Sequence, residues 1–104
     1  MNYPPCKCGN PRIGRLWDAA TGWRARCDDC CRRDAATIRE KALGGVEPNG
    51  HLPLPKRNLC AVCGEPATDS TGLKGQGIYN LCKTHITPAL ALWDELMLTY
   101  PPAP

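Results

Sequence analysis

Phenylalanine is absent from these 104 residues, and aromatic residues together make up only 6% of the chain. No apolar stretch approaches the roughly 18 residues that cross a bilayer, so we expect no membrane partner. The first residues contain no apolar signal-peptide core, and we therefore expect a cytoplasmic protein. Eleven prolines and ten glycines further limit regular structure. The two halves of the chain have only roughly 45 residues each, near the size below which a hydrophobic core alone seldom suffices.

The chain does have eight cysteines, and most of them occur in close pairs. Cys60 and Cys63 form a C-x2-C pair, which is followed after 18 residues by Cys82 and His85 in a C-x2-H pair. This spacing is typical of a structural zinc site, in which zinc binds four ligands in a closed tetrahedron. Such a site contributes on the order of 10–16 kcal/mol to folding and would supply the missing stability.

The same pattern occurs earlier in the chain, shifted by 55 residues. The shift aligns six positions of the first half with six of the second, and five of these pairs are identities. The pairs are Cys8 with Cys63, Gly9 with Gly64, Pro11 with Pro66, Gly22 with Gly77, Cys27 with Cys82 and Cys30 with His85. Only the first ligand is out of step, because Cys6 and Cys8 form C-x-C. The pattern therefore indicates an internal repeat.

The repeat predicts two zinc ions per chain. Site one consists of Cys6, Cys8, Cys27 and Cys30, and site two consists of Cys60, Cys63, Cys82 and His85. Cys31 could replace Cys30 as a ligand, although its place in the helical pattern favours a small buried thiol. A disulfide framework is the alternative use of eight cysteines. The pair spacings, and a histidine in a cysteine position, favour a metal instead.

Each half of the repeat is predicted to form a tight turn bearing two cysteines (the knuckle), a β-hairpin and a helix. We expect hairpins at residues 12–26 and 67–81, and helices at residues 29–43 and from Thr87 to about Tyr100, with Pro88 in the first helical position. This order resembles the treble-clef group of zinc fingers over residues 6–43 and 60–100. The resemblance implies a small metal-stabilised α+β fold of two tandem zinc modules. Residues 1–46 form the first module, residues 47–58 a Pro/Gly-rich linker and residues 59–104 the second module. Whether the modules fuse into one core is left open.

Charge is unevenly distributed between the modules. Residues 1–46 contain nine Lys/Arg and five Asp/Glu, giving +4, and residues 47–104 contain four and five, giving −1, for a total of +3. Arginine forms bidentate contacts with phosphate, and Trp17 and Trp23 could add stacking surfaces. The predicted nucleic-acid contacts are Arg12, Arg15, Arg24, Arg26, Arg32 and Arg33. A solvated face of mixed charge is the alternative, because Asp28, Asp29, Asp34 and Glu40 interrupt the basic residues.

The second predicted helix is apolar over most of its circumference. One stripe consists of Ile86, Leu90, Trp93 and Met97, and a second stripe adds Ala89, Leu92, Leu96 and Tyr100. Such a helix must be covered, either by the first module or the linker, or by a protein partner or a second copy. In the latter case the partner contacts would be Leu92, Trp93, Leu96 and Tyr100.

These features favour a non-enzymatic regulatory module. It would contact nucleic acid through its basic first module, and a protein partner or second copy through its C-terminal helix. The alternative is a pure protein-interaction adaptor or inhibitor of a larger complex, without nucleic-acid contact. A nuclease or redox enzyme is a third hypothesis, but closed zinc tetrahedra activate no water. With only two histidines, one of them a predicted ligand, we identify no catalytic set and expect no small-molecule substrate.

Overall fold

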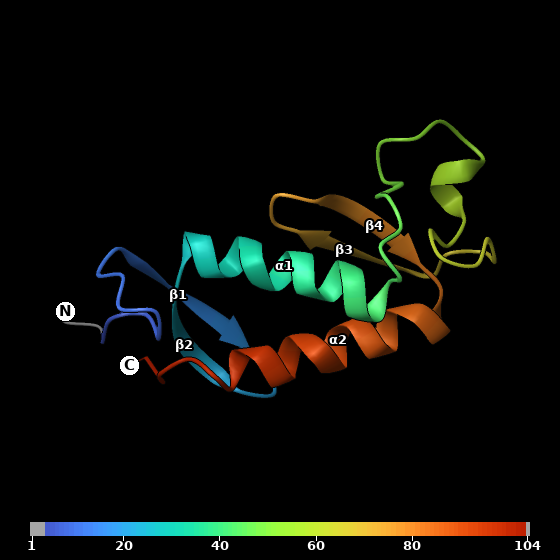
Figure 1. Ribbon diagram of the computed structural model, residues 1–104. Helices are drawn as coiled ribbons and strands as arrows, with labels where there is room; N and C mark the ends of the chain where they lie inside the picture. Colours follow the sequence, from blue (N-terminus) through green and yellow to red (C-terminus); the bar gives the residue numbers. More distant parts are fainter. Residues whose placement is uncertain (1–3, 104) are drawn as a thin grey trace.

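The computed structural model describes residues 4–103 as two hairpins and two helices (Figure 1). Strands β1 (Ile13–Asp18) and β2 (Gly22–Cys27) precede helix α1 (Asp28–Ala42). Strands β3 (Asp69–Leu73) and β4 (Gly77–Leu81) precede helix α2 (Lys83–Met97). A short 3-10 helix, Lys56–Asn58, lies in the connection. The predicted small α+β fold, with a hairpin and then a helix in each half, is confirmed. Within the described residues, no helix has the length and apolar character needed to span a bilayer.

The two hairpins pair in the same register once the 55-residue shift is applied. Trp17 lies opposite Trp23 in the first hairpin, and their equivalents Gly72 and Ile78 lie opposite each other in the second. Both hairpins are antiparallel and both lead directly into a helix. The repeat seen in the sequence is therefore also a repeat of strand pairing.

Helix α2 begins earlier than predicted. It starts at Lys83, directly after its N-cap residue Cys82, and Pro88 lies inside the helix rather than at its first position. Proline inside a helix lacks the N–H that would bond to the carbonyl four residues before it, and its ring crowds that carbonyl, so this position is less favourable than the predicted one. The backbone N–H groups of His85 and Ile86 both donate to the Cys82 carbonyl, which fixes the earlier start. The helix also ends three residues before the predicted end.

Helices α1 and α2 lie side by side and run in opposite directions, with the two hairpins toward opposite ends of the helix pair (Figure 1). The main core draws its buried residues from both halves of the repeat. They include Ala35, Ile38, Leu43, Leu73, Tyr79, Leu81, Ile86 and Ala89. The two modules therefore share one core, whereas the boundaries predicted for them at residues 46 and 59 stay a prediction.

The core also covers most of the apolar surface of α2. Leu92, Trp93 and Leu96 pack against it and are partly buried, so their contacts lie within the chain itself. Leu90, which belongs to the predicted inward stripe, is instead 52% exposed. Its neighbour Ala89 is buried in its place. Internal packing thus accounts for the buried part of these three side chains, and their contact with a partner stays a prediction.

After each helix, the chain pairs with the hairpin of the other module. The N–H of Ala103, which follows α2, donates to the carbonyl of Trp23 in β2 over 2.9 Å. The N–H of Gly50, which follows α1, donates to the carbonyl of Ile78 in β4, also over 2.9 Å. Trp23 and Ile78 are equivalent positions of the repeat. The segment that follows the helix of each module therefore pairs with the hairpin of the other module, and we call this the reciprocal exchange of segments.

A buried ion pair in the first module accepts a hydrogen bond from Tyr100, which follows α2. Arg26 Nη1 donates to Asp34 Oδ2 over 3.0 Å, and the Tyr100 hydroxyl donates to the same oxygen over 2.5 Å. The guanidinium of Arg26 also lies 4.5 Å from the centre of the Trp93 ring. Burial raises the pKa of Tyr100, and the hydrogen bond to Asp34 raises it further, which keeps the hydroxyl protonated.

Two predicted surface contacts are therefore wrong. Arg26 and Tyr100 are each only 2% exposed, so Arg26 does not reach a nucleic acid and Tyr100 does not reach a partner. The physical reason is the same for both residues. Each satisfies the buried carboxylate of Asp34, which without them would be an unpaired charge in the interior.

Candidate metal centres

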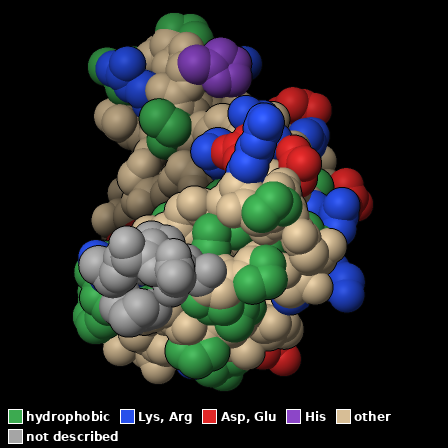
Figure 2. All heavy atoms as spheres, turned by 90° about the vertical axis from the view of Figure 1, so that its left-hand side faces the viewer, with side chains coloured by type: hydrophobic (Ala, Val, Ile, Leu, Met, Phe, Trp, Pro, Cys, Tyr) green, Lys and Arg blue, Asp and Glu red, His purple; other side chains and the backbone are tan. Residues whose placement is uncertain are grey.

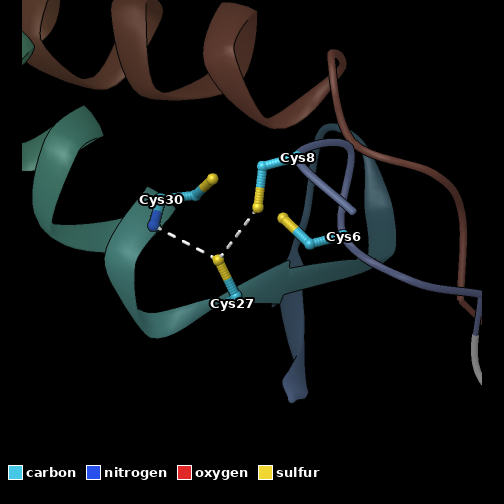
Figure 3. A group of neighbouring side chains, drawn as sticks. All are labelled: Cys6, Cys8, Cys27 and Cys30. Atoms are coloured by element: carbon cyan, nitrogen blue, oxygen red, sulfur yellow. Dashed lines mark hydrogen bonds between the residues drawn. The ribbon is translucent and has the colours of Figure 1, made fainter. Parts of the chain in front are cut away.

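The four predicted ligands of site one converge where the first knuckle meets β2 and α1 (Figure 3). Their sulfur atoms lie within 4.8 Å of one another, and the Sγ atoms of Cys8 and Cys27 are 3.6 Å apart. Cys27 is also the N-cap of α1, and its Sγ accepts a hydrogen bond from the N–H of Cys30. Gly9 has φ +88°, a conformation that favours glycine and turns the knuckle toward Cys6. Four thiolates at about 2.3 Å from one zinc lie about 3.8 Å apart, so the cluster fits this ion.

Site two repeats this arrangement at the start of α2. The ligand atoms of Cys60, Cys63, Cys82 and His85 lie within 4.8 Å of one another. The Sγ atoms of Cys63 and Cys82 are 3.6 Å apart, and His85 Nδ1 is 3.6 Å from Cys60 Sγ. Gly64, the equivalent of the first knuckle's glycine, has φ +77°. The structure thus brings together both predicted ligand sets, with Nδ1 as the nitrogen that faces the sulfur atoms.

Each site is enclosed on its inner side and reaches the surface at one cysteine. In site one, Cys6, Cys27 and Cys30 are at most 2% exposed, whereas Cys8 is exposed. In site two the exposed cysteine is Cys63, which the repeat aligns with Cys8. Four protein ligands complete a tetrahedron and leave no coordination position for a substrate. The arrangement therefore suits an ion held by protein ligands alone.

Backbone N–H groups favour the thiolate form at the first cysteine of each site. Burial by itself would raise the pKa of Cys60, but hydrogen bonds from three backbone N–H groups and a neighbouring thiol lower it to about 6. Burial would also raise the pKa of Cys6, but hydrogen bonds from backbone N–H groups and neighbouring thiols outweigh this effect and lower the pKa to about 7. Burial and the neighbouring thiols raise the pKa of Cys30 to about 12. Because metals bind thiolates, each site offers one ready ligand and releases protons from others on binding.

Cys31 lies outside the cluster of site one, and Cys30 is the residue that completes the set of four. The Cys31 Sγ instead accepts a hydrogen bond from Arg26 Nη2 over 3.3 Å. Cys31 is only half-buried, so its expected role as a small buried thiol holds in part.

The predicted nucleic-acid contacts do not form one continuous surface. Arg12, Arg15, Arg32 and Arg33 are exposed, Arg24 is half-buried and Arg26 is buried. Arg24 and Arg26 share a face of the hairpin, as expected, but this face is turned toward the C-terminal segment. There the Arg24 Nη1 donates to the Tyr100 carbonyl over 3.1 Å. Arg32 is exposed but pairs with Asp28 over 2.9 Å.

Charges of both signs stand close together on the end of the molecule that carries the chain termini (Figure 2). Blue and red side chains are interleaved along the right-hand side of that view, and hydrophobic side chains gather in the middle and lower part. The mixed-charge alternative therefore describes this face, and phosphate contacts have to come from individual exposed arginines.

Sequence reasoning missed a buried polar residue in the linker. Asn49 is 5% exposed, and its Oδ1 accepts a hydrogen bond from the N–H of Asn80 over 2.8 Å. Its Nδ2 donates to the carbonyl of Leu59 over 2.6 Å. No local pattern marks this residue, because its partners come from β4 and from the approach to the second knuckle.

No protein-family model matches this chain, and comparisons with curated proteins and with solved structures gave no significant match. The function therefore has to be inferred from the sites and surfaces themselves.

Proposed function

We propose that this chain is a non-enzymatic zinc module of treble-clef type that contacts nucleic acid through its first module. The donor chemistry supports zinc, since sets of four thiolates, or three thiolates and one imidazole, are typical of its closed tetrahedral sites. The ions would supply folding free energy, and the residues around them would supply the binding surface. A reducing compartment such as the cytoplasm would keep the eight cysteines available for metal.

The difference in charge between two halves of one repeat carries the nucleic-acid proposal. The first half has a net charge of +4 and the second −1, although their ligands and hairpin registers correspond. Arg12, Arg15 and Arg33 remain exposed in the first module after the internal contacts have been formed. Arginines of this kind bind phosphate and make affinity strongly dependent on salt.

The test is binding of the zinc-loaded chain to mixed-sequence nucleic acid at several salt concentrations. Replacing Arg12 and Arg15 together with Ala should weaken binding and reduce the slope of log K against log salt by about 0.7–0.9 for each phosphate that is no longer neutralised. The matched control replaces Lys56 and Arg57 with Ala, two exposed cations outside the first module, and should leave the slope unchanged. Failure to bind even at low salt would contradict the proposal.

A protein-interaction adaptor without nucleic-acid contact is the alternative, and part of its predicted surface is used for packing within the chain. Leu92, Trp93 and Leu96 already contact the chain's own core. On α2 and its cap, Leu90 and Leu98 are 52% and 59% exposed. These two side chains, together with the exposed parts of the other three, are the surface that the alternative would use.

Replacing Leu92 and Leu96 with Asp tests whether this stripe is core. Two carboxylates placed against apolar neighbours should lower the free energy of unfolding by more than about 2 kcal/mol, and the double variant should unfold at lower urea. The matched control replaces the exposed Leu90 and Leu98 with Asp and should retain the wild-type stability within about 0.5 kcal/mol. Equal stability of the two double variants would argue against internal packing.

A further inference from the structure

Two tryptophan side chains are exposed on the outer face of the first hairpin. Trp17 of β1 lies opposite Trp23 of β2, and the two residues are 59% and 40% exposed. Their ring centroids are 5.4 Å apart, with an angle of 52° between the ring planes. The guanidinium carbon of Arg15 lies 4.1 Å from the centre of the Trp23 ring. We call Arg15, Trp17 and Trp23 the aromatic face.

The second module shows that the fold does not require an aromatic face. Its hairpin has the same register, and the positions equivalent to the aromatic face are Ser70, Gly72 and Ile78. That hairpin leads into a helix that begins beside a metal ligand set, just as the first one does. Large parts of both rings nevertheless remain in contact with water, and the second hairpin folds without them. They are therefore candidates for binding.

The charge of the aromatic face restricts the kind of ligand. Arg15 places a positive charge over the Trp23 ring, which is itself in contact with Trp17. Asp18 is the one acidic residue in β1 and β2, and strand alternation turns it to the opposite side, which it shares with Arg24 and Arg26. A ligand that combines a planar ring with a nearby negative charge complements this arrangement, and an unpaired nucleotide has both.

We infer that the aromatic face binds single-stranded nucleic acid, with an unpaired base stacked on Trp17 and Arg15 against a neighbouring phosphate. Inside a duplex the faces of the bases are covered by their neighbours, and proteins reach only the backbone and the base edges. Stacking on a tryptophan therefore requires an unpaired strand. The inference rests on the proposed function and names the class of nucleic acid that it involves.

The test compares a mixed-sequence DNA strand of about 12 nucleotides, within the usual size of single-strand sites, with the duplex of the same sequence. The zinc-loaded chain should bind the strand at least about 5-fold more tightly than the duplex, with quenching of tryptophan fluorescence. Trp17→Ala should weaken strand binding by about 5- to 150-fold and leave duplex binding and the salt slope unchanged. Trp17→Phe keeps an aromatic ring and should restore most of the affinity.

The matched control is Ile78→Ala, because Ile78 is 57% exposed at the equivalent position of the second hairpin. This variant should bind the strand as the wild type does. Equal affinity for strand and duplex, with no effect of Trp17→Ala, would overturn the inference and leave the phosphate contacts of the proposed function intact. Absence of binding to either form would remove both, and the aromatic face would then be a surface for a protein. If Trp17→Ala loses its zinc, the Trp17→Phe variant serves as the test instead. A zinc-loaded Phe variant should still prefer the strand to the duplex, because it keeps an aromatic ring, and loss of that preference would overturn the inference.

Discussion

Replacement of Arg26 by Met should destabilise the protein and leave its affinity for nucleic acid unchanged. The Arg26 side chain is 0% exposed and that of Asp34 is 8% exposed. Methionine is of similar length but donates no hydrogen bond, so the Asp34 carboxylate would keep its bond from Tyr100 and lose its charge partner. Removing one member of a buried ion pair costs about 3–5 kcal/mol. Loss of the cation–π contact with Trp93 is included in that range, since such contacts contribute about 0.5–2 kcal/mol.

Urea unfolding followed by far-UV circular dichroism, with zinc in fixed excess, measures this change in free energy. Arg33→Met is the matched control, because Arg33 is exposed on α1 and its replacement should change stability by less than about 0.5 kcal/mol. Adding Asp34→Ala and Tyr100→Phe to Arg26→Met removes the polar groups together and should recover at least half of the loss. A loss below about 1 kcal/mol in Arg26→Met, with weaker nucleic-acid binding, would refute the burial of this arginine.

Three further measurements test the metal sites and the exchange of segments. Cys30→Ser should reduce the zinc content from two ions to one per chain, whereas Cys31→Ser should retain both, as measured by elemental analysis. The number of protons released on zinc binding should rise as the pH is lowered from about 8 to about 5. Over that range Cys6 and Cys60, with pKa values of about 7 and about 6, change from thiolate to thiol and then have a proton to release. Calorimetry in two buffers gives the proton count, and a count that stays constant with pH would contradict the assignment. The lowered pKa values of these two thiols also stabilise the zinc-free fold at a pH above the usual thiol pKa. This contribution to the free energy of unfolding is lost as the pH falls through 7 to 6. Gly50→Ala should lower the free energy of unfolding by about 1–3 kcal/mol, because a Cβ at this position would lie 2.7 Å from side-chain atoms of Ile78 in β4. An unchanged urea midpoint would mean that the segment after α1 does not pack on that strand.

The ligand sets and the two hairpins could be predicted because short sequence spacings determine both. The contacts between the modules could not, since they join residues far apart in the chain. Tyr100 reaches Asp34 across 66 positions, and no local pattern encodes that bond. One signal was nevertheless present in the repeat. The 55-residue shift aligns Arg26 with Leu81 and Asp34 with Ala89, both of which are buried, so the two charged residues already occupied core positions.

The start of α2 differs from the prediction for another reason. The preference of proline for the first helical position favours a start at Pro88, although the C-x2-H spacing already places Cys82 and His85 within one helical turn. In the first module the equivalent residues, Cys27 and Cys30, also lie at the start of a helix. The spacing of the ligands is therefore a better guide to this boundary than the proline.

The reciprocal exchange of segments has a consequence for the order in which the chain can fold. Arg24 and Tyr100 are 76 residues apart, and β2 is synthesised long before the segment that follows α2. Until that segment arrives, the outer edge of β2 has unpaired backbone groups, which in other proteins invite pairing with a neighbouring chain. Occupation of site one alone would leave this edge open during synthesis. Site two lies at the start of α2, so a metal ion bound there would order this helix. The helix leads residues 101–103 back to β2, where they cover the open edge.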